Sequence, residues 1–127
     1  MVARLSAIRE DRLKKIEELR SLGVNPYPSR PEKIAEKISV ARKKLGKSVS
    51  VAGRIWGWRD HGESIFADIK DETGKIQLFF QKKNLNDFKL LKYFDIGDFI
   101  EAEGKVIKTE AGELTIDVVR FRLLTKS

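Results

Sequence analysis

Apolar and polar residues alternate over residues 49–81. A period of two is typical of β-strands, because successive side chains point to opposite faces of a sheet. The apolar positions fall into three runs: Val49, Val51, Gly53 and Ile55; Ile65, Ala67 and Ile69; Ile76, Leu78 and Phe80. Clusters rich in Asp and Gly at residues 60–63 and 71–74 separate the runs and suit hairpin turns. The pattern predicts three consecutive strands with one apolar face.

The opposite face of these strands is both aromatic and polar. Parity places Phe66, Gln77, Phe79 and Trp56 on it, and Trp58 too if the strand continues without a bulge. Such a face suits single-stranded nucleic acid, because rings stack on bases while amide and guanidinium groups bond base edges. The alternative is that these rings pack beneath a loop or another domain. The pattern alone leaves both interpretations open.

The flanking segments predict helices and a further strand pair. Residues 4–22 have the spacing of a basic amphipathic helix, residues 25–31 form a proline-rich connector, and residues 32–45 are helical in pattern again. Residues 84–94 predict a short helix with Asn84 as its N-cap. Residues 99–108 and 113–124 predict two strands, with a β-bulge near Val118 where the apolar phase changes.

The predicted order of elements, β-β-β-α-β-β, is that of a five-stranded OB-fold barrel. We therefore expect a mostly β protein with a helical N-terminal extension at residues 1–48 and an OB-fold domain at residues 49–127. OB barrels bind oligonucleotides on the face of their second and third strands. That is where parity places Phe66 and Gln77.

The charge of this 127-residue chain is unevenly distributed. Residues 1–48 hold 13 Lys/Arg and 6 Asp/Glu, a net +7, whereas residues 49–127 hold 13 of each, a net 0. A basic extension beside a neutral domain commonly attracts nucleic-acid phosphates whatever their sequence. The alternative is a solvated helix surface.

Few residues suit catalysis or metal binding. The chain has no Cys, which excludes disulfides and Cys-based zinc sites, and its single histidine, His61, falls in a predicted turn and is expected to be solvated. We therefore expect no metal site, no catalytic residue and no cofactor in this segment. No apolar run reaches the ~20 residues of a membrane span, and no signal peptide is apparent, so we expect a cytoplasmic protein without a membrane partner.

Several motifs, taken in order, resemble the N-terminal anticodon-binding region of class II lysyl-tRNA synthetases. They are Glu18-Leu19-Arg20-Ser21-Leu22-Gly23 with Asn25-Pro26-Tyr27-Pro28; Val51-Ala52-Gly53-Arg54-Ile55; Arg59 and Gly62; Phe66 and Asp71; Gly74-Lys75-Ile76-Gln77-Leu78; Asp95-Ile96-Gly97-Asp98; and Gly112-Glu113-Leu114-Thr115-Ile116 with Leu123-Leu124-Thr125-Lys126. The resemblance covers nearly the whole chain. Aspartyl- and asparaginyl-tRNA synthetases share the barrel, but the leading helix, the connector and the last hairpin favour the lysine enzyme.

The resemblance implies binding of lysine tRNA through a UUU-type anticodon. It implies that Phe66 stacks on the middle anticodon base, that Gln77 and Arg59 hydrogen-bond this base, and that Glu113 reads the first base. Arg54 is expected in the same group, and further stacking surfaces are expected at Trp56, Trp58 and Phe79. The basic residues expected to contact the tRNA backbone are Arg9, Arg12, Lys15 and Arg20.

The parent implied by the resemblance is a homodimeric ligase that uses ATP and magnesium. We expect the segment itself to be non-catalytic, because the family's catalytic domain would follow after Ser127, and a monomer is one expectation for it. Two other functions remain open. One is a free-standing OB protein that binds single-stranded nucleic acid, and the other is a protein-interaction module of a synthetase dimer or complex.

Overall fold

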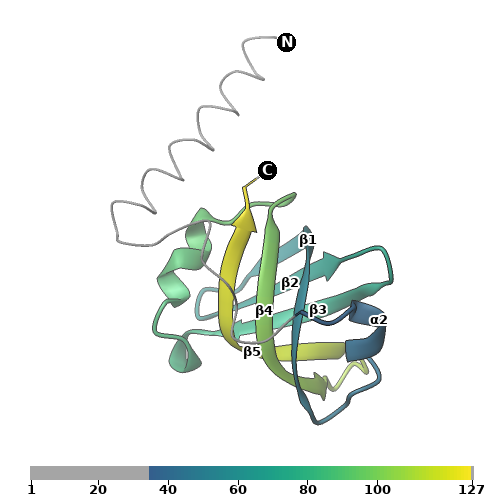
Figure 1. Cartoon of the computed structure of the whole chain (residues 1–127). Coiled ribbons are helices and arrows are strands. Elements are labelled where there is room, and N and C mark those ends of the chain that lie inside the picture. The colour runs from purple at the N-terminus through teal and green to yellow at the C-terminus, as the bar shows by residue number, and fades with distance from the viewer. Residues whose placement is uncertain (1–34, 127) are drawn as a thin grey trace.

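Five strands form a closed barrel in the computed structural model, which describes residues 35–126 (Figure 1). The strands are β1 (Ser48–Asp60), β2 (Ser64–Lys70), β3 (Lys75–Gln81), β4 (Phe99–Lys108) and β5 (Leu114–Thr125). Around the barrel their order is β1-β2-β3-β5-β4, and every neighbouring pair is antiparallel except β3 and β5, which are parallel. The closed five-stranded sheet confirms the predicted OB fold.

Each strand contributes inward-facing apolar side chains to one core. Ile55, Ala67, Leu78, Ile100 and Ile116, one from each strand, are at most 1% exposed. The period-two pattern predicted the inward positions of β2 and β3 correctly, because both strands bury one face along their whole length.

Strand β1 contains a bulge that reverses the parity of its second half. Ile55 pairs with Ile69 and Gly57 pairs with Asp68, so Trp56 is an extra residue on β1. Trp58 then pairs with the inward-facing Ala67 and packs against the core. The condition for an outward Trp58, a strand that continues without a bulge, is therefore not met, and Trp58 faces the core.

Another bulge lies near Val118 in β5, where the phase change predicted it. Glu103 pairs with Arg120 and Gly104 pairs with Val118, which leaves Val119 as the extra, exposed residue. Gly104 permits the close approach of β4 to β5 at this bulge, because a Cβ at position 104 would lie 2.1 Å from the carbonyl oxygen of Asp117.

The helix predicted over residues 32–45 is wrong for most of its described part. Only α2 (Ile38–Ala41) is helical, because Lys37 is extended and Glu36 forms a parallel bridge with Val51 of β1. Ile38 and Ala41 are fully buried, so the barrel core includes side chains that precede residue 49.

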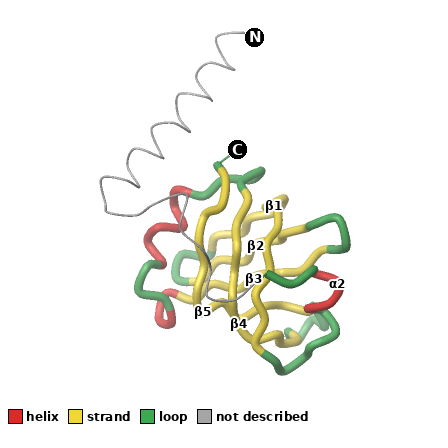
Figure 2. The backbone as a smooth tube through the Cα atoms, in the orientation of Figure 1, coloured by secondary structure: helices red, strands yellow, loops and turns green. Residues whose placement is uncertain are grey.

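The helix predicted over residues 84–94 is replaced by two short 3-10 segments, η1 (Lys82–Asn84) and η2 (Phe88–Tyr93). Leu85 between them is extended, which interrupts the helix while its side chain enters the core. Asn84 is not an N-cap, because it ends η1 and its side-chain amide donates to Gln81. Figure 2 shows these segments and α2 (red) on opposite sides of the barrel (yellow). None of the helices in residues 35–126 has the length and apolar character needed to cross a membrane.

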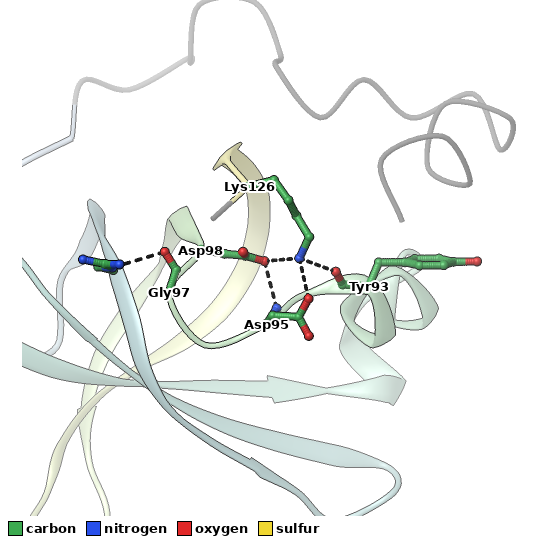
Figure 3. A network of polar contacts seen from close by, with 6 residues as sticks. Tyr93, Asp95, Gly97, Asp98 and Lys126 are labelled. Carbon is green, nitrogen blue, oxygen red and sulfur yellow. Dashed lines mark hydrogen bonds and ion pairs between the residues drawn. The ribbon is translucent and has the colours of Figure 1, made fainter. Parts of the chain in front are cut away.

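A buried ion cluster fastens the end of β5 to the loop before β4 (Figure 3). The ammonium of Lys126, whose side chain is 1% exposed, donates to the carbonyl of Tyr93 at 2.9 Å and to the carboxylates of Asp95 at 2.8 Å and Asp98 at 2.6 Å. Asp98 is fully buried and also accepts the backbone N–H of Asp95. The cluster therefore fixes the point at which the chain leaves the barrel.

Candidate nucleic-acid interface

A chain of hydrogen bonds crosses the outward face of strands β1, β2, β3 and β5. Arg59 on β1 forms an ion pair with Asp68 on β2 at 2.6 Å, and its second terminal nitrogen donates to the side-chain oxygen of Gln77 on β3 at 2.9 Å. The amide nitrogen of Gln77 donates to the hydroxyl of Thr115 on β5 at 3.0 Å. This hydroxyl donates in turn to the backbone carbonyl of Glu113. The chain holds the polar groups in one arrangement before any ligand binds.

The charge of Arg59 is reinforced by its surroundings. The hydrogen bond to Asp68 raises the pKa of the guanidinium above its ordinary value, partly opposed by desolvation, and the negative charges of Asp68 and Glu113 raise the pKa further. Arg59 therefore stays a cation that donates hydrogen bonds at every physiological pH.

Two phenylalanines form a stacked pair beside this hydrogen-bond chain. Phe66 on β2 pairs directly with Phe79 on β3, with ring centroids 4.6 Å apart and ring planes 21° apart. The ring of His61 lies edge-on to Phe66 at 5.9 Å. Both phenylalanines are half-buried, so Phe79 and His61 fix the ring of Phe66 on the surface.

Two adjoining hollows occupy this face. The larger, of about 600 Å³, is lined by Arg59, His61, Phe66, Gln77, Thr109, Glu110, Ala111 and Glu113. The smaller, of about 250 Å³, is lined by Trp56, Arg59, Asp68, Lys75, Ile76, Gln77 and Glu113. Arg59, Gln77 and Glu113 border both hollows. An aromatic ring also borders each hollow, so each can offer a base both a π-face and edge-binding groups.

Glu113 is positioned by the turn between β4 and β5. The hydroxyl of Thr109 accepts the backbone N–H of Glu113 at 3.1 Å, and the carbonyl of Glu113 accepts the backbone N–H of Thr109 at 3.0 Å. Gly112 has a φ of +85°, which favours glycine over residues with a side chain. The turn thus places the exposed Glu113 carboxylate at the rim shared by the two hollows.

The structure brings together Phe66, Gln77, Arg59 and Glu113, with Phe79 supporting Phe66 and Trp56 lining the smaller hollow.

Two other expected residues lie elsewhere. Arg54 donates to the carbonyl of Gly97 at 3.3 Å, and its guanidinium lies over the ring of Phe99. The ring of Trp58 lies 6.3 Å from that of Phe80 and 6.4 Å from that of Phe94, among core residues. The expected backbone contacts Arg9, Arg12, Lys15 and Arg20 fall outside the described residues.

Two residues of this hydrogen-bond chain, Asp68 and Thr115, are not among the site residues predicted from the sequence. Asp68 orients Arg59, and Thr115 orients Gln77. Asp68 lies two residues after Phe66 on the same strand, so the parity that found Phe66 also predicts an outward Asp68. Thr115 carried no such signal, because its position beside Gln77 arises from the parallel pairing of β3 with β5.

Within residues 35–126, no group of three or more His, Cys, Asp or Glu side chains is arranged to hold a metal ion. The fold and its polar, aromatic surface define a nucleic-acid-binding OB barrel. Residues 49–124, more than half of the chain, match the family described as OB-fold nucleic acid binding domain, tRNA anti-codon. The chain belongs to this family.

The relatives point to one group of proteins. The chain is 43% identical over 126 residues to the lysine–tRNA ligase of Methanoculleus marisnigri, with 91% of the chain and 25% of the relative covered. It is 41% identical to the lysine–tRNA ligase of Fervidobacterium nodosum (96% and 26% covered) and 42% identical to the chloroplastic/mitochondrial lysine–tRNA ligase of Arabidopsis thaliana (95% and 22% covered). The chain thus spans about a quarter of the length of these curated relatives. They confirm the resemblance to lysyl-tRNA synthetases.

Proposed function

We propose that this chain is the anticodon-binding module of a lysine–tRNA ligase and reads a UUU-type anticodon. The observation that carries the proposal is the hydrogen-bonded chain from Asp68 through Arg59 and Gln77 to Thr115, which lies beside the half-buried ring of Phe66 at the rim of the larger hollow. A stacked base gains affinity from the ring, and its edge meets groups that are already oriented.

In the proposed complex, the middle base of the anticodon stacks on Phe66 and its edge bonds Arg59 and Gln77. The carboxylate of Glu113 accepts an N–H of the first base, which it can reach because it borders both hollows. Trp56 offers a second stacking surface, since its side chain lines the smaller hollow. The basic residues of the leading segment contact tRNA phosphates, which agrees with the +7 charge of residues 1–48.

The parent activity, ATP-dependent ligation of lysine to tRNA in the cytoplasm by a homodimer, belongs to the same proposal. The names of the relatives, which match more than nine-tenths of the chain, support the ligation of lysine to tRNA. The use of ATP, the homodimer and the cytoplasmic location follow from the family resemblance alone.

Replacement of Phe66 tests this function. Binding of a fluorescent UUU anticodon stem-loop is measured by anisotropy for the wild type, Phe66→Ala and Phe66→Leu. Loss of one base stack costs about 1–3 kcal/mol, or roughly 5–150-fold in Kd. Leu keeps an apolar side chain but has no π-face, so it is expected to restore little affinity.

Phe99→Ala is the matched control, because Phe99 is an exposed ring (42%) on β4 and lines neither hollow. Its Kd is expected to stay within about twofold of the wild type. Equal affinity of the wild type for UUU and scrambled loops contradicts anticodon reading and favours a general single-strand binder.

A further inference from the structure

A third hollow, of about 560 Å³, adjoins the base-binding face at the edge formed by α2 and the β2–β3 turn. Its lining includes the cations Arg42, Lys43 and Lys75 and the hydroxyls of Ser39 and Thr73. No aromatic ring lines it, so it offers cations and the hydroxyl of Ser39 but no surface for base stacking; the hydroxyl of Thr73 already donates to Asp71. Phosphate oxygens, rather than bases, match this set of donors.

This basic edge is held in place by a set of hydrogen bonds. One carboxylate oxygen of Asp71 accepts the backbone N–H of Ile38 at 2.9 Å, and the other accepts the backbone N–H groups of Thr73 and Gly74 and the hydroxyl of Thr73. The hydroxyl of Thr73 accepts the backbone N–H of Ser39 at 3.1 Å. Both bonds to α2 span more than thirty residues of sequence, so they fasten α2 to the hairpin.

Further contacts orient the cations themselves. Arg42 donates to the carbonyl of Lys75 at 2.8 Å, which brings the guanidinium to the start of β3. The ammonium of Lys75 lies 5.3 Å from the ring centroid of Trp56. Lys75 therefore borders both the stacking surface of the smaller hollow and the third hollow.

Glu113 sets the direction in which a ligand can lie. Its carboxylate borders the third hollow as well as the other two, and it repels a phosphate placed beside it. A nucleotide spanning the boundary therefore has its base toward Gln77 and Glu113 and its phosphate toward Arg42 and Lys43.

We propose that Arg42, Lys43 and Lys75 form a phosphate shelf that binds the sugar-phosphate backbone of single-stranded RNA next to the base-reading face. The inference rests on the proposed function and adds to it the route by which the strand leaves that face. Asp71 acts as a positioning residue, because it orients the shelf without bordering the hollow.

Salt dependence of binding tests the shelf. The Kd of the UUU stem-loop is measured over a series of salt concentrations for the wild type and for Arg42→Gln/Lys43→Gln. Each phosphate contact to a single strand contributes about 0.7 to the slope of log Kd against log salt, so losing two lowers the slope by about 1.4. The ratio of affinities for UUU and scrambled loops is expected to stay unchanged, because phosphate contacts carry no base information.

Lys89→Gln/Lys92→Gln is the matched control. Both lysines are exposed on η2, across the barrel from α2, and this variant removes the same charge (Figure 1). A second shelf variant, Lys43→Gln/Lys75→Gln, keeps the hydrogen bond from Arg42 to the hairpin, so it removes charge without loosening α2. Thermal melting followed by circular dichroism shows whether each variant is folded.

Neutral methylphosphonate linkages, placed singly along the loop, locate the contact. The wild type is expected to lose affinity at one or two linkages adjacent to the anticodon, and these linkages are expected to have a smaller effect in the Arg42→Gln/Lys43→Gln variant, which keeps only Lys75 of the three cations. If the slope of log Kd against log salt falls no more in the shelf variants than in the η2 control, the phosphate shelf is refuted and anticodon reading is unaffected. A wild type that binds no RNA overturns both.

Discussion

Replacing Asp71 by Asn tests whether one carboxylate holds α2 against the barrel. Asn keeps one carbonyl oxygen, which can still accept the three hydrogen bonds from Thr73 and Gly74. Its amide nitrogen then faces the backbone N–H of Ile38, so a donor meets a donor where a 2.9 Å bond existed. Loss of one hydrogen bond to a charged group costs about 1.5–3 kcal/mol, which is the expected decrease in the free energy of unfolding.

The pH dependence of this effect has a definite sign. Burial tends to raise the pKa of Asp71, but the hydrogen bonds from Thr73, Ile38 and Gly74 outweigh it and lower the pKa overall. A lowered folded-state pKa means that the stabilisation is complete above the unfolded-state value of about 3.9 and is lost as the pH falls through the folded-state value. Asn does not titrate, so the gap between wild type and variant should be constant from pH 7 to about 4 and shrink below that.

Urea denaturation at a series of pH values measures both quantities. Asp60→Asn is the matched control, since Asp60 also lies at a hairpin turn but accepts one hydrogen bond, from the backbone N–H of Gly62, which Asn can keep. The decrease in the free energy of unfolding for Asp60→Asn is expected to stay below about 0.5 kcal/mol. An Asp71→Asn variant as stable as this control refutes the role of the carboxylate in holding α2.

Two further predictions concern the ion cluster and the β1 bulge. Lys126→Met is expected to lower the free energy of unfolding by about 3 kcal/mol, because it breaks the buried ion pair with Asp98. The decrease stays at this low end of the usual range, since Asp98 still accepts the backbone N–H of Asp95. A urea midpoint equal to that of the wild type contradicts this prediction. Gly57→Ala places a Cβ 2.5 Å from the carboxylate oxygen of Asp68 that accepts from Arg59, so this carboxylate must shift. In anisotropy titrations we expect the ratio of affinities for UUU and scrambled loops to fall several-fold, while the free energy of unfolding changes by under about 1 kcal/mol. An unchanged ratio argues against orientation of Arg59 by Asp68.

Strand parity was predictable from the sequence wherever a strand buries one face throughout. Strands β2 and β3 follow this rule, so the outward positions of Phe66, Gln77 and Phe79 followed from the alternation alone. The bulge in β5 was also predictable, because two apolar series lie out of phase on either side of Val118.

The features that the sequence did not predict depend on tertiary contacts, which leave little trace in the sequence. Trp56 and Trp58 have the same spacing with or without a bulge, and only pairing with β2 decides which of them points outward. The apolar stripe of residues 32–45 is compatible with a long helix, but the pairing of Glu36 with Val51 competes with helix formation and shortens it. Arg54 fits the motif of the resemblance, yet the carbonyl of Gly97 and the ring of Phe99 hold it elsewhere.

The orientation of the Gln77 amide bears on how the proposed site discriminates between bases. Its oxygen accepts from Arg59 and its nitrogen donates to Thr115, so a flipped amide would place two donors together at Arg59. Uridine offers an N–H donor beside a carbonyl acceptor, and cytidine offers the reverse order. Since the amide cannot invert without breaking both bonds, the wrong base places like groups opposite each other, which costs about 1–3 kcal/mol where the bound base excludes water. Stacking on Phe66 is similar for both pyrimidines, so in the proposed complex we expect the fixed amide, rather than the ring, to favour uridine.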